Sequence, residues 1–245
     1  MPSTVPNKVP NKVPNKVPNT ALDNSLSELR LFQLISPSLP VGGFTYSQGL
    51  EWAIEAQWVT DKPSLENWLQ SILEASVATL ELPVLIRLLN AFNHADNASV
   101  VHWSQWLVAC RETMELRKEE RQRGAALARL LPSLDIQVPA HLATTVTSCQ
   151  LTGIALAASQ WGIDCQQLCR GYCWSWLENN VVAGVKLIPL GQTHGQQIML
   201  NMAKTIPAAV TQAVTTEDNE IRSSTPAMAI ASSRHETQYT RLFRS

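Results

Sequence analysis

Two segments of helical pattern are joined by the sequence Ser36-Pro37-Ser38-Leu39-Pro40-Val41-Gly42-Gly43-Phe44-Thr45-Tyr46-Ser47-Gln48-Gly49-Leu50-Glu51. Two prolines, three glycines and several hydroxyl side chains occur within it. Proline fixes φ and lacks an amide donor, whereas glycine allows positive φ and a close approach of the backbone. Because connections between helices are usually short, this long and specialised one predicts a surface built for contact.

Apolar residues at helical spacing continue on both sides of this connection. A helix beginning near Leu26 is expected to end at Pro37, and a second is expected from Ser47 to Ala56. Ser64 is a good candidate N-cap for a third helix. The side chains that this third helix should direct toward a core are Leu65, Trp68, Leu69, Ile72, Leu73 and Ala75.

Further helices are expected along the rest of the chain, with prolines at several starts. Pro83 should open or kink a segment over 84–93, and a long helix is expected from Ser99 to about Leu131. The small residues of 139–161 predict a central helix, and Asp164 is a candidate N-cap for the next one. Two more helices should begin at Pro189 and Pro207. Since no region alternates with period two, the prediction is an all-α fold, a single-domain helical bundle of about eight to ten helices.

Composition divides the chain into three parts. Residues 1–23 are dominated by repeats of Val-Pro-Asn-Lys, which place a proline every fourth residue and predict a disordered tail. Residues 24–222 form the expected helical domain. Residues 223–245 are interpreted as a linker followed by a C-terminal docking tail. The polar composition of the linker begins slightly earlier and extends over about 217–233.

The overall charge and the cysteine content limit the possible partners and compartment. The chain has 245 residues, 45% of them hydrophobic, and a formal net charge of −1, which gives no electrostatic case for binding nucleic acid or an anionic membrane. No apolar run reaches the roughly 18 residues of a spanning helix. Five cysteines are an odd number and argue against a disulfide framework. We expect a reduced, cytoplasmic protein.

Catalytic and metal-binding patterns are weak. The chain has no P-loop, no G-x-S-x-G and no H-E-x-x-H, so we expect no catalytic residue, no cofactor and no enzyme activity. Cys165, Cys169 and Cys173 share one face of a helix, but their spacing differs from the C-x₂-C of common zinc sites. Buried structural cysteines are the first interpretation, and a metallochaperone that binds nickel or zinc through this helix is the alternative.

The charged run Arg117-Lys118-Glu119-Glu120-Arg121-Gln122-Arg123 is the most polar part of the expected helices. Charges of both signs, here Glu115 with Glu119 and Arg117 with Arg121, are common on solvated helix faces. A solvated face is therefore the first interpretation, and contact with a partner protein is the second.

The chain ends with apolar and cationic side chains after the polar linker. Tyr239, Leu242 and Phe243 cannot bury their own apolar surface within so short a segment, and Arg241 lies among them. The segment must therefore dock on its own domain or on another chain, and aromatic and arginine residues are frequent at interfaces. We expect the isolated tail to be mobile until it binds a partner.

Three segments in order resemble the urease accessory protein family UreF. They are the connection from Ser36 to Glu51, the segment Val185-Lys186-Leu187-Ile188-Pro189-Leu190-Gly191-Gln192-Thr193, and the terminal Tyr239-Thr240-Arg241-Leu242-Phe243-Arg244-Ser245. The resemblance implies a non-enzymatic adaptor that acts with UreD (also called UreH) and the GTPase UreG in inserting nickel into apo-urease, and that self-associates as a homodimer.

The resemblance also assigns roles to particular residues. Glu51, Lys186 and Gln192 lie in segments that it associates with the partner GTPase. It associates the tail with docking on UreD and with self-association. For Glu51 there is also a purely structural interpretation, because a carboxylate in the first turn of a helix is favoured by the helix dipole.

Overall fold

The computed structural model describes residues 19–244, with side chains from Ser25 onward. Helix α1 (Asn19–Ile35) begins five residues before the predicted domain boundary at residue 24. The repeats of Val-Pro-Asn-Lys lie almost wholly outside the described residues, so the prediction of a disordered tail stays a prediction.

The described part of the chain is helical throughout and contains no strand, so the predicted all-α fold is confirmed. Ten of its α-helices have ten or more residues, and two short ones have only six. After α1 the α-helices are α2 (Leu50–Glu55), α3 (Lys62–Ile72), α4 (Leu82–Asn93), α5 (Asn97–Cys110), α6 (Met114–Leu130), α7 (Ala143–Ser148), α8 (Gln150–Gln160), α9 (Cys165–Leu187), α10 (Gln192–Ala203), α11 (Ile206–Thr215) and α12 (Pro226–His235).

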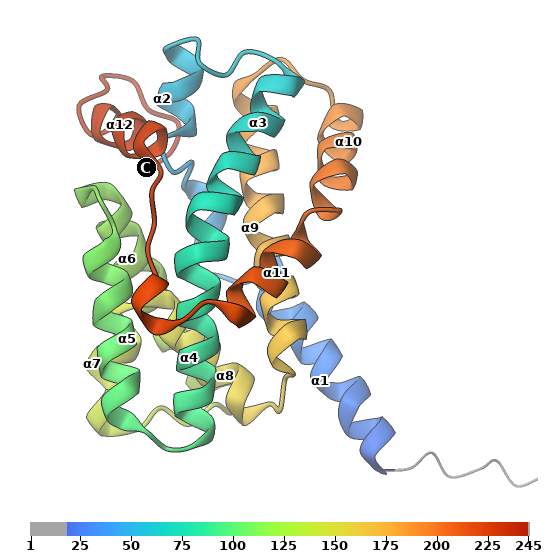
Figure 1. Ribbon diagram of the computed structural model, residues 1–245, viewed down its shortest axis with the longest axis vertical. Coiled ribbons are helices and arrows are strands. Elements are labelled where there is room, and N and C mark those ends of the chain that lie inside the picture. The colour runs from blue at the N-terminus through green and yellow to red at the C-terminus, as the bar shows by residue number, and fades with distance from the viewer. Residues whose placement is uncertain (1–18, 245) are drawn as a thin grey trace, which may run out of the picture.

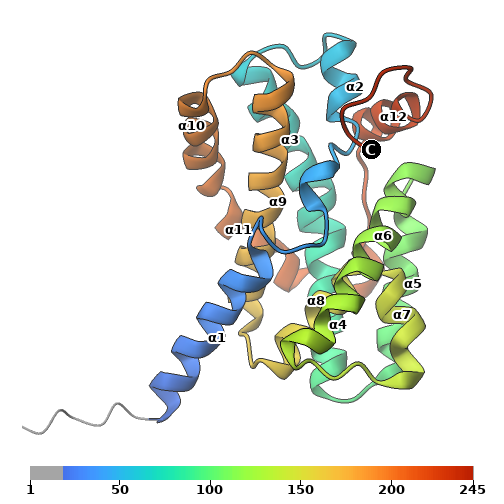
Figure 2. The same ribbon diagram turned by 180° about the vertical axis from the view of Figure 1, so that it is seen from behind.

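A continuous rod through the middle of the molecule organises the bundle. Helices α3 and α4 are joined end to end by a π-helical stretch, Leu73–Glu81, and Figure 1 shows this rod beside the long helix α9. Pro83 lies at the second residue of α4, directly after the π-helical stretch, and its missing amide donor leaves one hydrogen bond of the rod unmade there. Helices α10 and α11 flank one side of the rod and α5 to α7 the other, while α2 and α12 cover one end (Figures 1 and 2).

Two groups of buried apolar side chains meet along this rod. One surrounds α3 and most of α9, and the other surrounds α4 and α8. The predicted core residues of α3, from Leu65 to Leu73, are all buried, as the helical spacing required. Ala75 alone is half-buried. Helix α8 is buried from Gln150 to Ala158, which confirms a central position for the second half of the small-residue segment, whereas Ala143 and Thr144 in its first half are exposed.

Two long helices expected from the sequence are broken. The segment predicted from Ser99 to Leu131 stops at Cys110 and restarts at Met114, because Thr113 accepts the amide of Leu116 at 3.2 Å as an N-cap. The segment expected over 139–161 contains the 3₁₀ turn Ala140–Leu142 and then α7, and it breaks again at Cys149.

Several helix ends also differ from expectation. Asp61, and not Ser64, is the N-cap of α3, and the two side chains form a reciprocal capping box. Asp164 caps α9 as predicted, with amides from Gln166 and Gln167 at 2.9 and 3.0 Å. Helix α10 begins at Gln192 rather than at Pro189. The expected loose linker contains a 3₁₀ turn, Asp218–Glu220, and most of helix α12.

Candidate functional site

The connection between α1 and α2, residues 36–49, is here called the motif loop. Gly42 and Gly49 have φ of 73° and 84°, in the left-handed region that glycine enters without strain. The hydroxyl of Thr45 donates to the carbonyl of Gly42 at 2.8 Å, which closes the turn between them. A Cβ at Gly49 would lie 2.7 Å from the backbone nitrogen of Ser232, so the loop packs against α12 at this glycine.

Glu51 joins the motif loop to the C-terminal tail. Its side chain is buried, and its carboxylate accepts the amide of Leu242 at 2.6 Å and that of Phe243 at 2.8 Å. The amide of Arg244 donates to the carbonyl of Thr45 at 2.8 Å. The tail therefore docks on its own domain, and Glu51 holds it there through backbone amides, which every residue except proline would provide.

Three further side chains extend this junction. His235, fully buried at the end of α12, lies with Nε2 3.2 Å from Glu51 and Nδ1 2.8 Å from Glu115. Arg241 donates to the other oxygen of Glu115 at 2.9 Å. We call Glu51, Glu115, His235 and Arg241 the tail latch, because together they connect α2, α6 and α12 to the last residues of the chain.

A second buried charge cluster, the central ion network, lies deeper in the bundle. Arg111 donates to Glu81 at 2.8 Å and to Glu120 at 2.9 Å, and Tyr172 donates to the second oxygen of Glu81. Glu120 also accepts the amide of Gln150 at 2.8 Å and so serves the N-terminus of α8. These residues come from the rod, α6, α8, α9 and the break after α5, so the network joins all of them.

The titration of the central ion network follows its charges. Burial opposes ionisation of Glu81, but the Arg111 guanidinium and the hydroxyl of Tyr172 outweigh it and hold the pKa of Glu81 below its usual value. Burial also works against the charge on Arg111, yet Glu81 and Glu120 raise its pKa well above the ordinary value. Burial and the charge of Glu81 raise the pKa of Tyr172, so the tyrosine stays protonated and remains a donor.

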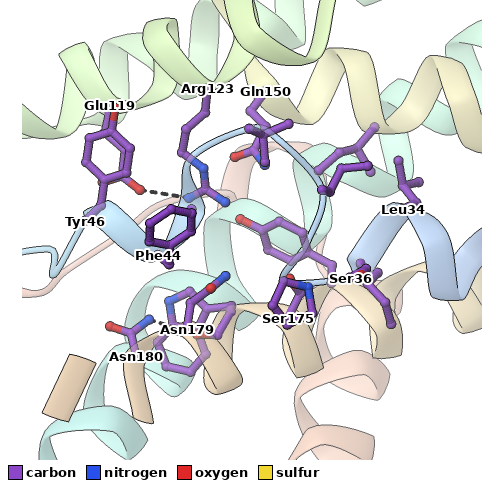
Figure 3. A pocket seen from close by; sticks show the side chains of 18 of the residues that line it. Leu34, Ser36, Phe44, Tyr46, Glu119, Arg123, Gln150, Ser175, Asn179 and Asn180 are labelled. Atoms are coloured by element: carbon purple, nitrogen blue, oxygen red, sulfur yellow. Dashed lines mark hydrogen bonds and ion pairs between the residues drawn. The ribbon is translucent and has the colours of Figure 1, made fainter. Parts of the chain in front are cut away.

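A small cavity of about 50 Å³ lies beneath the motif loop (Figure 3). Arg123 points into it from α6 and pairs with Glu119 at 2.8 Å. Burial raises the pKa of Glu119 despite this ion pair. Among the described residues that line the cavity, Nε of Arg123 and Oδ1 of Asn180 are buried without a hydrogen-bond partner. Such a space suits ordered water, which commonly satisfies buried polar groups.

The charged run on α6 is not the solvated face that its mixed charges suggested. Glu115, Glu119 and Glu120 are buried at 4–6% exposure, while Lys118 and Arg121 are exposed. The carboxylates turn inward because Arg111, Arg123 and Arg241 meet them there.

Of the remaining predicted site residues, Lys186, Gln192, Tyr239 and Leu242 are exposed, whereas Phe243, expected to contact a partner, is buried against its own domain. Lys186 lies in the last turn of α9, and Gln192 is the first residue of α10. Both helix ends lie at the same end of the molecule as α2 and α12 (Figures 1 and 2). In the described structure no hydrogen bond or ion pair connects either side chain to the tail latch. One end of the bundle therefore carries two separate surfaces. One is formed by the tail and the tail latch, within which Glu51 is buried, and the other is the exposed segment with Lys186 and Gln192.

The cysteine face of α9 points into the core. Cys169 and Cys173 are fully buried, and burial raises the pKa of Cys173 to about 12. Contact with Cys165 and burial raise the pKa of Cys169 further, so both thiols stay protonated, the form that does not ligate metals. Cys165 is half-buried. Within the described residues no group of three or more His, Cys, Asp or Glu could hold a metal ion.

Sequence reasoning missed Glu81, Arg111, Glu120 and His235. The sequence indicated only the helix start next to Arg111, because Thr113 followed by Glu115 is a typical N-cap and first turn. For His235 no local pattern existed, because its two carboxylate partners lie 184 and 120 residues away.

No helix in the described range has both the length and the hydropathy that crossing a bilayer requires.

Comparison with known proteins identifies the family. The family model UreF matches residues 59–203, more than half of the chain. A urease accessory protein UreF of Alcanivorax borkumensis is 51% identical over 229 residues, which cover 91% of this chain and all of that protein. Proteins of the same name from Pseudomonas putida (strain GB-1) and Escherichia coli O157:H7 are 50% and 47% identical, covering 91% and 89% of this chain and 100% and 97% of their own lengths. The chain therefore belongs to the UreF family of urease accessory proteins.

Proposed function

We propose that this protein is a cytoplasmic, non-enzymatic adaptor in urease maturation. It joins UreD (UreH) and the GTPase UreG in a complex that inserts nickel into the active site of apo-urease. Family membership supports a role in urease maturation. The individual partners and the nickel step come from the resemblance of the motif loop, the segment around Lys186 and the tail.

The observation that carries the proposal is the geometry of the tail. Its backbone is fixed on Glu51 by two amides, yet Tyr239 and Leu242 are exposed at 103% and 68%. A fixed backbone with exposed aromatic and aliphatic side chains offers a preorganised contact, which reduces the ordering cost of binding. Arg241, with 40% of its side chain exposed, adds a donor at the same place. We assign this face to UreD.

Glu51 and the segment containing Lys186 and Gln192 have different roles in this proposal. Glu51 is covered by the tail, so it acts by holding the tail and the motif loop in position. Lys186 and Gln192 are exposed and available for direct contact, and we assign them to UreG. Both surfaces lie at the same end of the molecule (Figure 1), which allows one adaptor to bind both partners side by side.

We assign self-association to a different face. Leu29 and Phe32 of α1 are exposed at 62% and 61%, and Trp174 of α9 at 40%. Phe32 and Trp174 line a groove of about 430 Å³, together with Ile206 and Pro207 at the start of α11. Exposed apolar side chains around a groove are typical of protein contact surfaces. Phe32→Asp should convert a homodimer to a monomer in sedimentation velocity, whereas Phe44→Asp, in the motif loop, should not.

The UreD assignment is tested by Leu242→Asp in a co-purification assay with UreD. The substitution keeps the backbone amide on Glu51 but removes the apolar contact, so we expect complex formation to weaken by about tenfold or more. Leu200→Asp is the matched control, since Leu200 is 66% exposed on α10 and should leave UreD binding unchanged. Equal retention of UreD by both variants would contradict the assignment.

The UreG assignment is tested by Lys186→Ala, with Lys204→Ala, an exposed lysine after α10, as the control. We expect Lys186→Ala to reduce UreG recruitment and the nickel content of urease while UreD binding and helical content stay normal. Normal recruitment by both variants would remove Lys186 from the interface. The metallochaperone alternative is not favoured, because two of its three thiols are buried and protonated.

A further inference from the structure

The segment that leads into α12, residues 221–225, is here called the strap. It runs along the rod toward α12 (Figure 1), and two of its backbone amides donate to the rod. The amide of Arg222 donates to the carbonyl of Thr79 at 3.2 Å, and the amide of Ser224 donates to the carbonyl of Ala75 at 3.0 Å. Both carbonyls belong to the π-helical stretch. Part of the segment that was expected to be a loose linker is therefore bound to the rod through its backbone.

The spacing of the two hydrogen bonds matches the geometry of both partners. Ala75 and Thr79 are four residues apart, which is about one turn of the rod, or roughly 5 to 6 Å along its axis. Arg222 and Ser224 are two residues apart in an extended chain, which spans roughly 6.6 to 6.8 Å. Because these two lengths are similar, alternate amides of the strap reach successive turns of the rod.

Pro83 makes one of these carbonyls available. In an α-helix each amide donates to the carbonyl four residues before it, so the α-helical donor to the carbonyl of Thr79 would be the amide of residue 83. Residue 83 is a proline at the second position of α4 and has no amide. Backbone carbonyls inside a protein need a donor, and Arg222 supplies the one that Pro83 lacks.

The strap fixes the start of α12, and the tail latch lies at the other end of that helix. The amide of Ala229 donates to the carbonyl of Thr225, the last residue of the strap, at 2.9 Å. In the middle of α12 the hydroxyls of Ser232 and Thr113 lie 2.8 Å apart. His235, a member of the tail latch, is the last residue of the helix. The position of the tail therefore depends on where the strap places α12.

We propose that Pro83 is a positioning residue for the C-terminal tail. By lacking an amide it leaves the carbonyl of Thr79 to the strap, the strap sets the position of α12, and α12 carries the tail latch. The central rod and the contact face of the tail are thereby coupled through backbone hydrogen bonds. This coupling belongs to the isolated chain and does not depend on the partners proposed above.

Pro83→Ala tests the proposal in the full-length protein. The new amide at residue 83 competes with Arg222 for the carbonyl of Thr79. Removal of a proline favours the helix, so urea denaturation should show no loss of global stability. Amide hydrogen exchange followed by nuclear magnetic resonance should nevertheless accelerate at both strap amides, on the order of threefold to tenfold, because a hydrogen bond is lost there. The two tail amides held by Glu51 should exchange faster as well.

Two comparisons separate the missing donor from other effects of the proline. Pro207→Ala is the matched control, because Pro207 lies in the first turn of α11, where a new amide has no acceptor within the helix, and all four amides should keep their exchange rates. Replacing Pro83 by the α-hydroxy acid analogue of alanine removes the ring but still provides no donor, so the strap should stay protected.

Three results would overturn the proposal. The first is a strap that is as well protected in Pro83→Ala as in the parent protein, since the new amide would then not compete with Arg222. The second is a strap that loosens to the same extent with the α-hydroxy acid, because the ring and not the missing donor would be responsible. The third is a loosened strap with unchanged tail amides, which would leave Pro83 without a role in positioning the tail.

Discussion

Glu115 and Glu120 are both buried on helix α6, five residues apart, but their cationic partners differ in kind. Glu120 in the central ion network pairs with Arg111, whose side chain is 6% exposed inside the helical body. Glu115 in the tail latch pairs with Arg241, which is 40% exposed and belongs to the C-terminal tail. Burial of a carboxylate therefore does not by itself mark a fixed structural element.

The difference lies in where the donors come from. In the central ion network they are side chains of residues that helices hold on both sides, so the network can be lost only when the bundle opens. In the tail latch they are backbone amides and an arginine at the end of the chain, which can leave while the helices stay folded. Local opening of such segments has a lower free energy than global unfolding.

The largest effect is expected for Arg111→Met. It leaves Glu81 and Glu120 buried without their cation, and the free energy of unfolding should fall by about 3–5 kcal/mol in urea denaturation. Arg129→Met, at an exposed position on the same helix as Glu120, is the control and should stay within about 0.5 kcal/mol of the parent. Similar losses for both variants would show that the central ion network does not stabilise the bundle.

A smaller effect is expected when acid protonates the same network. The pKa of Glu81 is held below the ordinary value of 4.5, so its contribution is present above that pH and is lost as the pH falls through the lower folded value. Thermal stability should decline below about pH 4.5, and Arg111→Met should flatten this part of the curve. A parent curve that is flat in acid would contradict this account of Glu81.

Gly49→Ala tests the contact between the motif loop and α12. Positive φ costs a residue with a Cβ on the order of 1–3 kcal/mol, and at Gly49 the new Cβ would also meet the backbone nitrogen of Ser232 at 2.7 Å. Gly162→Ala is matched, because its φ of 64° is also positive and no atom lies within 4 Å of the added Cβ. The excess destabilisation of Gly49→Ala over Gly162→Ala, measured by urea denaturation, reports the contact. No excess would mean that α12 moves freely at this place.

The smallest effect on global stability is expected for Arg241→Met. Its ion pair with Glu115 is partly exposed, so the free energy of unfolding should fall by less than about 1 kcal/mol. Hydrogen exchange at Leu242 and Phe243 should nevertheless accelerate, because these amides open with the tail. Arg234→Met, at an exposed position in the last turn of α12, should leave that exchange unchanged. A large global loss in Arg241→Met would place the tail latch in the same class as the central ion network.

The sequence by itself determined the features that depend on neighbouring residues. Helical spacing identified the all-α class and the buried face of α3, and Asp164 was recognisable as an N-cap because a cap acts on amides two and three residues away. The prolines and glycines marked the motif loop for the same reason, since their effect on φ is local.

Only the tertiary structure decided which charges are buried. Glu115 and Glu119 have the same i,i+4 spacing that a solvated helix face would show. Glu115 nevertheless turns inward to Arg241 of the C-terminal tail, and Glu119 pairs with Arg123 of the same helix beneath the motif loop. The tail was recognisable as an interaction element, but its anchor was not, because Glu51 and the amides it accepts are 191 and 192 residues apart. Periodicity reports which face of a helix is apolar, whereas the partner of a buried charge is set by long-range packing that no local pattern records.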